Sequence, residues 1–498
     1  MITFCTALAM LVLGYCIYGS FVERVFGADS SKKTPAYTME DGVDYVPMPT
    51  WRVYLIQFLN IAGTGPIFGA IQGVLFGPAA YFWIVLGCIF GGATHDYLAG
   101  MISLRKNGAS LPEIVGDQLG SSGRFAMRAL SLVLMVMVGA VFVTTPSALL
   151  SNLTGYESAS GDFYLSASFF AVIIFIYYIL ATLLPVSTLI GRIYPIFGVA
   201  LLFMAAGVAF GVFTQNGGMP EITDAFANHH PKQLPLFPML FITIACGAVS
   251  GFHATQSPMM ARCQKNEKHG RIVFYGAMIT EGVVALIWAA AAMKFADTLG
   301  TDGATPYEKL ANFMAQNNNN PAAVVNAICQ NWLGSVGAVL AVLGVVAAPI
   351  TSGDTALRAA RLIAADFLHV EQKTIVKRLM VAAPIFVLSA VIMNMDFSIL
   401  WRYFAWLNQT LSIFTFWTIT VWLFKNGKPY IITLIPALFM TCVCTTYIMI
   451  SPKEGLAALF PGVEAWPTIS YAVGIVVPLV FLCMFVKFMK NYKPELKA

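Results

Sequence analysis

The chain has 498 residues, of which 58% are hydrophobic and only 11% charged, with a formal net charge of +5. Soluble domains carry about a quarter charged residues, so this composition excludes an ordinary soluble protein. Apolar stretches long enough to cross a hydrocarbon core of roughly 30 Å as helices recur along the whole chain. No polar stretch between them is long enough for a separate soluble domain. We predict an all-α integral membrane protein with thirteen spans, at residues 2–22, 53–77, 79–104, 129–150, 163–184, 193–214, 236–258, 272–294, 332–357, 379–395, 403–424, 429–450 and 467–486.

The first span is predicted to remain as a helix and not to be a signal peptide. Met1 to Cys5 contain no Lys or Arg, and no small-residue cleavage pattern follows Phe21. The nine cysteines fall mostly inside the spans and show no paired metal spacing. We therefore expect neither a bound metal nor another cofactor.

Basic residues predict how the chain is oriented. Loops after spans 1, 3, 5, 7, 9 and 11, together with the C-terminus, hold 24 of the 29 Lys and Arg residues, which leaves five on the other side. Cytoplasmic loops are the ones enriched in Lys and Arg. The N-terminus is therefore expected outside, and the loop 23–52 and the C-terminal Lys487, Lys490, Lys493 and Lys497 in the cytoplasm. The scattered basic residues give no support for nucleic-acid binding.

Two spans contain breaks in their helical pattern. Span 2 is interrupted between Asn60 and Pro66, and span 7 between Cys246 and Pro258. Backbone groups freed at such a break cannot face lipid, so they must be buried in protein or line a wet cavity. A simple proline kink packed through glycines is the alternative for span 2. The breaks predict substrate-binding residues: Asn60, Gly63, Thr64, Gly65, Pro66, Gly247, Ser250, Gly251, Phe252 and His253.

The positions of the two breaks predict an inverted repeat. The second break comes five spans after the first, and the two spans run in opposite directions. Matching discontinuous helices in oppositely oriented halves are typical of secondary transporters. We predict a LeuT-like 5+5 fold with halves at 53–214 and 236–424. One extra N-terminal helix (1–22) and two extra C-terminal helices (429–490) complete it.

Several stretches resemble the carbon starvation protein A (CstA) family. They are Asp41 to Pro47, Asn60 to Gly69, His95 to Tyr97, Gly108 to Gly116, Gly251 to Pro258 and Thr351 to Thr355. The resemblance implies a multi-pass protein of the bacterial inner membrane and of the amino acid, polyamine and organocation transporter superfamily. It also implies uptake of peptides or pyruvate during carbon starvation. The chain is shorter than the long members, and Thr64 stands where an aliphatic residue is expected.

Ionisable residues inside spans are costly, by about 2.5–3.5 kcal/mol each, so each needs a partner or a role. His95 and Asp96 either relay protons or form a structural ion pair. His253 lies in the second break, where an imidazole can change charge near neutral pH. Glu281 is expected to pair with Lys294 or with another helix. Glu113 follows Pro112, and serves either as a gate or as a helix-start residue.

Coupling to a cation is expected at span 9. In folds of this superfamily, hydroxyl groups of the eighth core helix often hold a cation against the unwound first core helix. The corresponding residues here are Ile61, Thr351, Ser352 and Asp354. Sodium suits the hydroxyls, whereas Asp354 and His253 favour protons. The structural alternative is that Thr351 and Ser352 cap the helix and that Asp354 pairs with Arg358.

The function predicted from these features is secondary active import of a small nutrient, with H⁺ or Na⁺ as the coupling ion and the lipid bilayer as surroundings. Three alternatives stay open: an intramembrane enzyme using His95 and Asp96, a channel, and a starvation sensor. No metal-ligand motif supports the enzyme, matched broken helices disfavour a channel, and no signalling domain is present.

Overall fold

The computed structural model describes the chain except residues 43, 155–162, 184–185, 220, 225–226, 318, 373, 454, 461 and 494–498. Val43 of the Asp41–Pro47 stretch and the last residue of the predicted span 163–184 therefore lie outside the described residues. The described part is helical, and its one isolated β-bridge, between Met48 and Gln264, does not extend into a strand. This confirms the all-α prediction.

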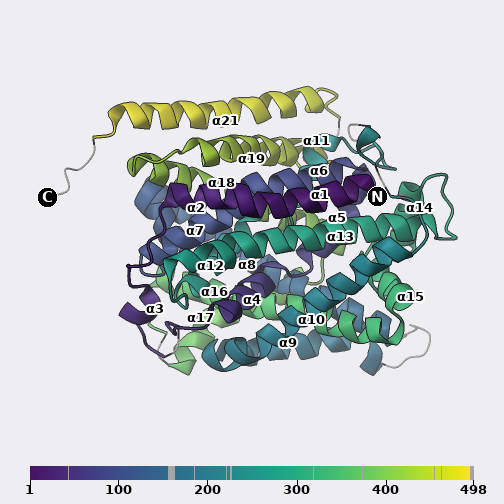
Figure 1. Cartoon of the computed structure of the whole chain (residues 1–498), viewed down its shortest axis with the longest axis horizontal. Coiled ribbons are helices and arrows are strands. Elements are labelled where there is room, and N and C mark those ends of the chain that lie inside the picture. The colour runs from purple at the N-terminus through teal and green to yellow at the C-terminus, as the bar shows by residue number, and fades with distance from the viewer. Residues whose placement is uncertain are drawn as a thin grey trace.

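The helices follow one another through the whole chain (Figure 1). The helices of the N-terminal part are α1 (Ile2–Leu13), α2 (Gly19–Phe26), α3 (Pro35–Thr38), α4 (Thr50–Ile61), α5 (Gly65–Gly73), α6 (Ala79–Leu86), α7 (Ala93–Arg105), α8 (Leu111–Leu153), α9 (Ala167–Leu183) and α10 (Val186–Thr214). Those of the C-terminal part are α11 (Leu236–Thr243), α12 (Gly251–Ala261), α13 (Ala277–Asp297), α14 (Pro306–Gln316), α15 (Ala322–Ala341), α16 (Ala347–Leu368), α17 (Ile375–Ile392), α18 (Phe397–Lys425), α19 (Ile431–Ile450), α20 (Leu456–Leu459) and α21 (Trp466–Asn491).

Helices occupy each of the predicted spans, but not all of them meet the length of a membrane crossing. Among the described residues, 8 helices are long and apolar enough to span, or 9 if the bent pair α4–α5 counts as one. Helix α9 is shorter, and the seventh predicted span is divided into α11 and α12. A polytopic membrane protein follows from these helices, whereas the number thirteen stays a prediction.

Burial separates a central group of helices from a peripheral one. The buried share of the most apolar part of each span differs widely. It is 78% in the span Glu267–Asp297, which contains α13, but 28% in α17 and 22% in α21. Helix α21 lies along one edge of the bundle beside α19 (Figure 1). Large apolar side chains are exposed on the peripheral helices, for example Phe203 on α10, Val387 on α17 and Ile475 on α21. In a bilayer they would face lipid, which explains why an exposed surface can be this apolar.

The polar run from Asn317 to Asn320, followed by Pro321, predicts that residues 295–331 form a mobile outer loop. This prediction is wrong for much of that segment, which is helical. Helix α14 occupies Pro306–Gln316, and α15 begins at Ala322, ten residues before the predicted span. The α14 start is stabilised by the Thr305 hydroxyl, which accepts the Glu308 N–H, and by Pro306 in its first turn. Leu310 and Met314 of α14 are buried, so the helix is held by tertiary packing.

The two predicted breaks exist and lie against each other, but the second is shorter than predicted, because residues 251–258 belong to helix α12. Helices α4 and α5 are bent by 47° across the residues between Ile61 and Gly65. The other break runs from Thr243, where α11 ends, to Gly251, where α12 begins. A Cβ atom on Gly65 would lie 2.5 Å from the Cβ and Sγ atoms of Cys246. The bare backbone of α5 therefore lets the two breaks come into direct contact.

The second break also packs without a gap against α18. A Cβ atom on Gly251 would lie 2.3 Å from the Ser412 nitrogen and 2.5 Å from the Asn408 oxygen, both backbone atoms. Because backbone cannot rotate away as a side chain can, this contact tolerates only glycine. The start of α12 is thereby fixed in position relative to α18.

We predict that Gly251→Ala destabilises the folded protein by about 1–3 kcal/mol or more, since overpacking costs that much in a tight core. The loss should exceed the gain of about 1 kcal/mol that alanine brings to a helix. Gly300→Ala is the control, because that glycine has no atom within 4 Å of its Cβ position. Thermal unfolding of the purified protein in detergent should show a lower midpoint for Gly251→Ala only. Equal midpoints for the two variants would contradict the contact.

Candidate functional site

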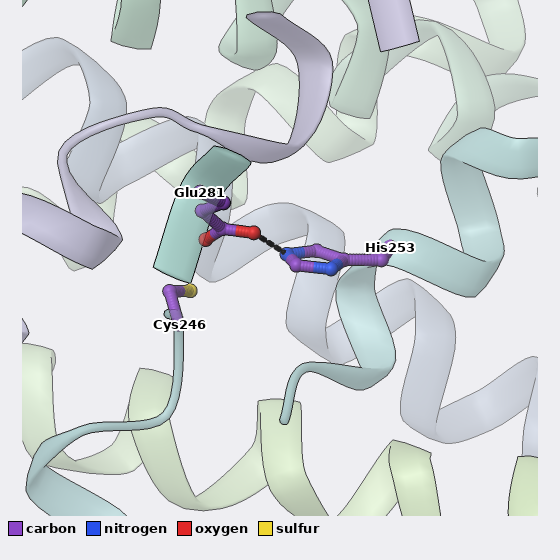
Figure 2. A group of neighbouring side chains, drawn as sticks. All are labelled: Cys246, His253 and Glu281. Carbon is purple, nitrogen blue, oxygen red and sulfur yellow. Dashed lines mark ion pairs between the residues drawn. The ribbon is translucent and has the colours of Figure 1, made fainter. Parts of the chain in front are cut away.

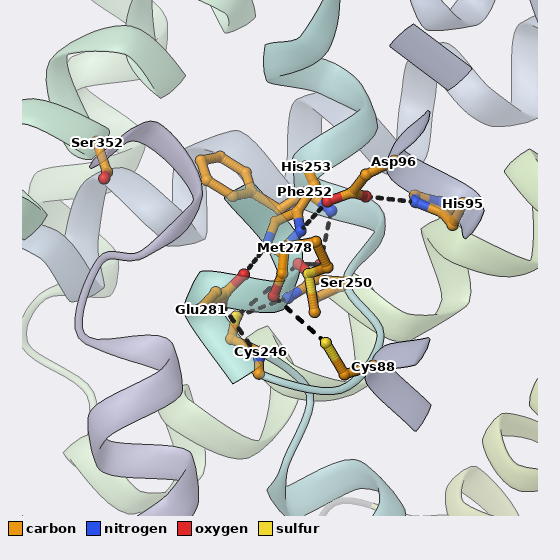
Figure 3. Close-up of polar contacts among 12 residues, drawn as sticks. Cys88, His95, Asp96, Cys246, Ser250, Phe252, His253, Met278, Glu281 and Ser352 are labelled. Atoms are coloured by element: carbon orange, nitrogen blue, oxygen red, sulfur yellow. Dashed lines mark hydrogen bonds and ion pairs between the residues drawn. The ribbon is translucent and has the colours of Figure 1, made fainter. Parts of the chain in front are cut away.

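Four buried ionisable side chains form a continuous row beside the second break (Figure 3). His95 and Asp96 come from α7, His253 from α12 and Glu281 from α13. Asp96 Oδ1 lies 2.8 Å from His95 Nδ1, and its Oδ2 lies 2.8 Å from His253 Nδ1. The other ring nitrogen of His253, Nε2, lies 3.4 Å from Glu281 Oε2. All four side chains are 0% exposed.

Asp96 sets the orientation of both imidazole rings. An ionised carboxylate only accepts hydrogen bonds, so each histidine donates its Nδ1–H to Asp96. The Nε2 atom of His253 is then left to face Glu281 at a distance just beyond a direct hydrogen bond. One proton can reside on either of these two groups. Adding this proton to the buried row or removing it changes the net charge of the interior by one unit. Such a change is energetically costly unless an opposite charge compensates it.

Glu281 also holds the backbone of the break. Its Oε1 atom accepts the N–H of Gly247 at 3.1 Å, and Gly247 has the left-handed φ of +89°. The carboxylate that faces His253 is therefore bonded to the segment that joins α11 to α12. A change of its charge must alter that bond, because an ionised acceptor bonds more strongly than a neutral one.

Asn408 of α18 holds the other end of the break. Its side-chain oxygen accepts the Ser250 hydroxyl at 3.1 Å and the Phe252 N–H at 2.7 Å. One of the free backbone donors in the first turn of α12 is thereby satisfied inside the bundle. Ser250, Gly251 and Phe252 thus serve to place His253, and the predicted residues of this break form one unit.

One group near the row has the composition of a metal site (Figure 2). Ligand atoms of Cys246, His253 and Glu281 lie within 4.8 Å of one another, and all three residues are buried. Cys, His and Glu are ligands of zinc-class ions. Protein partners already account for the arrangement, however. Asn408 Nδ2 lies 3.4 Å from the Cys246 sulfur, and His253 and Glu281 face each other.

The first break contains polar groups that have no partner among the described residues. Both side-chain polar atoms of Asn60 and the hydroxyl of Thr64 are buried and make no hydrogen bond there. Buried polar groups of this kind are normally satisfied, so they are suited to receive a ligand or water. The Cβ position of Gly247 lies 3.7 Å from Pro66, so the predicted binding residues of both breaks meet at one junction.

The residues predicted to hold a coupling cation do not form a single group. The Ser352 hydroxyl donates to the Leu59 carbonyl at 3.0 Å, near the first break, and lies apart from the ionisable row in Figure 3. The Thr351 hydroxyl instead donates to Ala348 of its own helix at 2.7 Å. The Ile61 carbonyl accepts the N–H of Gly63 at 3.0 Å.

Asp354 belongs to a separate buried cluster. Its Oδ2 atom accepts the Tyr194 hydroxyl at 2.7 Å, and its Oδ1 atom lies 3.9 Å from Arg358 Nη2. The guanidinium of Arg358 also donates to the Ala181 carbonyl of α9 at 2.7 Å. The predicted pairing with Arg358 is present but long, and Tyr194 is the closer partner.

Two further predictions are decided by these contacts. Glu113 accepts the Ser110 N–H at 2.8 Å in a capping box at the start of α8, as its helix-start interpretation requires. Of the two partners predicted for Glu281, Lys294 or another helix, the second is present: Glu281 faces His253 of α12, whereas Lys294 donates to the Val212 carbonyl at 2.7 Å. Sequence reasoning thus left Glu281 out of the site, although a carboxylate within an apolar span was the signal that could have placed it there.

Comparison with known proteins identifies relatives of the chain. Residues 1–158 and 149–329 match the model of the family described as carbon starvation protein CstA. A membrane protein of Haemophilus influenzae is 43% identical over 338 residues, which is 59% of this chain and 91% of that protein. Peptide transporter CstA of Bacillus subtilis is 30% identical over 350 residues, 58% of each protein.

Pyruvate/proton symporter BtsT of Escherichia coli is 28% identical over 343 residues, 57% of this chain and 48% of that protein. The chain thus matches about half the length of the relatives that are named as transporters. A crystal structure of the Eremococcus coleocola manganese transporter overlaps 92% of the chain at 12% identity, with a TM-score of 0.49 that is too low to support a shared fold. The family match covers well over half of the residues, and the chain belongs to the carbon starvation protein CstA family.

Proposed function

We propose that the protein is a secondary active transporter that imports small carboxylate-bearing nutrients, pyruvate-like acids or short peptides, together with protons. The observation that carries the proposal is the buried row His95–Asp96–His253–Glu281, which ends on the backbone of a broken helix. A bacterial inner membrane and a use during carbon starvation are part of the same proposal. Two relatives are named as a peptide transporter and a pyruvate/proton symporter, which supports this substrate range and this ion.

The proposed layout is the LeuT-like pair of five-helix halves at 53–214 and 236–424. The contact between the breaks of α4–α5 and α11–α12 supports it, because such transporters bind substrate where the discontinuous helices of the two halves meet. Helices α1, α19 and α21 are the extra helices of this layout, and they contain or adjoin exposed apolar surface.

The substrate carboxylate is proposed to bind at the start of α5. A helix N-terminus presents backbone N–H groups and a positive dipole end to an anion. Gly63 and Gly65 permit a close approach, and the unpartnered groups of Asn60 and Thr64 supply further hydrogen bonds. We propose that two of the three relay or gate candidates, His95 and Asp96, act in the proton relay. The third candidate, Glu113, caps helix α8.

Coupling is proposed to work through Glu281. When the proton that it shares with His253 is present, the charge that pulls on the Gly247 N–H is reduced. The α11–α12 segment is then freer to move relative to α13, and substrate and proton cross together. When the proton leaves, the stronger bond to Gly247 restores the original arrangement.

The coupling ion can be tested with purified protein in proteoliposomes. We expect labelled pyruvate or a labelled dipeptide to accumulate when an inward proton gradient is imposed, and not when a sodium gradient alone is imposed. Glu281→Gln should abolish proton-driven accumulation while substrate exchange continues, because the amide cannot carry the proton. Initial rates of uptake and of exchange are the two measurements.

Asp354→Asn makes the same chemical change in another buried carboxylate, outside the row, and is the matched control. If Asp354→Asn uncouples transport and Glu281→Gln does not, the proton site lies in α16. Accumulation driven by sodium and lost in Ser352→Ala would show instead that the coupling ion is sodium, held near the Leu59 carbonyl.

The orientation can be tested with an impermeant thiol reagent on intact cells. The exposed or partly exposed Cys5, Cys16, Cys442 and Cys483 are first changed to Ser. A single cysteine is then introduced by Lys265→Cys, on the side predicted to be cytoplasmic, or by Gln316→Cys, on the other side.

Both positions are exposed in the structure, so only the membrane should protect one of them. We expect labelling of the Gln316→Cys protein in intact cells and of the Lys265→Cys protein only after permeabilisation. The reverse pattern would invert the proposed orientation.

A further inference from the structure

A polar cavity of about 360 Å³ opens on the side of the bundle that is predicted to be outside. Helix α5 with the turn after it, the segment before α11, helix α14, the start of α18 and the loop after α19 form its walls. Its volume lies in the range of sites for small molecules. The polar residues that matter most are Gln72, His230, Lys232, Trp401, Arg402 and Lys453.

The cavity gathers most of the basic residues on this side. Five of the 29 Lys and Arg residues lie on the predicted outer side, and Lys232, Arg402 and Lys453 all line this one cavity. Basic residues are disfavoured on that side of membrane proteins, so their concentration around one cavity indicates a local use. Among the described residues that line it there is no Asp or Glu. Nearby Asp396 caps α18 at Ser398 and Ile399, and its carboxylate also attracts the charge of Lys453.

The titration of His230 is consistent with a positive potential in the cavity. Burial and the charges of Lys232 and Arg402 lower the pKa of His230 to about 4. The ring is therefore neutral at physiological pH, and its Nδ1 atom accepts the Lys232 N–H at 3.1 Å. Burial opposes a charge of either sign, whereas the positive charges of Lys232 and Arg402 oppose a cation and favour an anion.

The floor of the cavity leads toward the two breaks. Trp401 lines the cavity, is 4% exposed, and has an indole N–H with no partner among the described residues. Its ring lies 5.7 Å from that of Phe68 on α5 and 5.5 Å from that of Phe404. The Phe142 ring continues this series, because it lies 6.0 Å from the Phe404 ring and 6.3 Å from the Phe252 ring. Aromatic rings therefore separate the cavity from the start of α12.

We propose that this cavity is an entry site that captures the carboxylate of an incoming substrate before the aromatic rings move aside. Lys232, Arg402 and Lys453 supply the attraction, and Trp401 supplies a hydrogen-bond donor at the floor. This inference rests on the proposed import of carboxylates. It adds a second binding site, which selects for a negatively charged ligand. Charge of one sign in a low-dielectric hollow raises the local concentration of the opposite ion, and salt weakens the effect over about 8–10 Å.

The first test measures the potential in the cavity and does not depend on transport. In purified protein without the exposed native cysteines, Ala315→Cys places a thiol on the cavity wall, whereas Gln215→Cys places one on the same side away from it. Each thiol is treated with an anionic and with a cationic methanethiosulfonate reagent. We expect the ratio of anionic to cationic reaction rates to be several-fold higher for Ala315→Cys, and to fall as salt is added.

The basic residues are then removed together as Lys232→Gln, Arg402→Gln and Lys453→Gln. This change should lower the ratio for Ala315→Cys to the value for Gln215→Cys, whereas Lys309→Gln, which removes a basic residue of the same side that does not line the cavity, should not. Pyruvate should slow the labelling of Ala315→Cys, and choline should not. A ratio that is equal at the two positions, or unchanged by the triple substitution, would overturn the proposal.

The second test uses uptake in proteoliposomes. The triple variant should show a KM for pyruvate raised several-fold at low ionic strength with an unchanged maximal rate, and Lys309→Gln should leave both constants unchanged. An unchanged KM in the triple variant would overturn the entry site while leaving the import function intact. A positive labelling result in a protein that moves no carboxylate would instead overturn the import function alone.

Discussion

The contact between the carboxylate of Glu281 and the backbone of Gly247 connects the chemistry of the protein to its architecture. Gly247 lies in a segment that cannot be helical and cannot face lipid, so its N–H needs an acceptor inside the bundle. A charged acceptor is also the group that is most expensive to bury. His253 offsets that cost from the far side of the carboxylate, and Asp96 fixes the His253 ring. Removing any member would leave an unpaired buried charge or donor, at a cost of roughly 3–5 kcal/mol.

Glycine makes the rest of the arrangement possible. The bare face of α5 brings the two breaks together at Cys246, and Gly251 brings α12 against the backbone of α18. Both contacts are too close for any side chain, so the two interrupted helices cannot drift apart without losing packing over their whole length. We therefore expect the backbone motion proposed for coupling in the short segment between Thr243 and Gly251, which is hydrogen-bonded to Glu281 and Asn408. Substrate entering from the basic cavity would meet this segment behind the aromatic rings.

The sequence allowed the breaks to be predicted, because Gly, Pro and Asn interrupt apolar periodicity in a way that can be read along one helix. It did not allow the row of ionisable residues to be predicted. Asp96 and His253 are 157 residues apart, and only the packing of α7 against α12 shows that they share a hydrogen bond. The same limit explains why Glu281 was not among the predicted site residues. It also explains why the expected cation residues are divided, since Ser352 contacts Leu59 and Asp354 contacts Tyr194 from different faces of α16. The ordered helix α14 was missed because it is only 11 residues long, has polar residues interspersed among its apolar ones, and is held by two buried side chains, Leu310 and Met314.

The central claim is that Glu281 carries the transported proton, and infrared difference spectroscopy tests it directly. Spectra of the purified protein with and without substrate should contain a band from a protonated carboxyl group. That band should be lost in Glu281→Gln and kept in Glu113→Gln, whose carboxylate caps α8. A substrate-induced band that is the same in Glu281→Gln as in the unsubstituted protein would contradict the account.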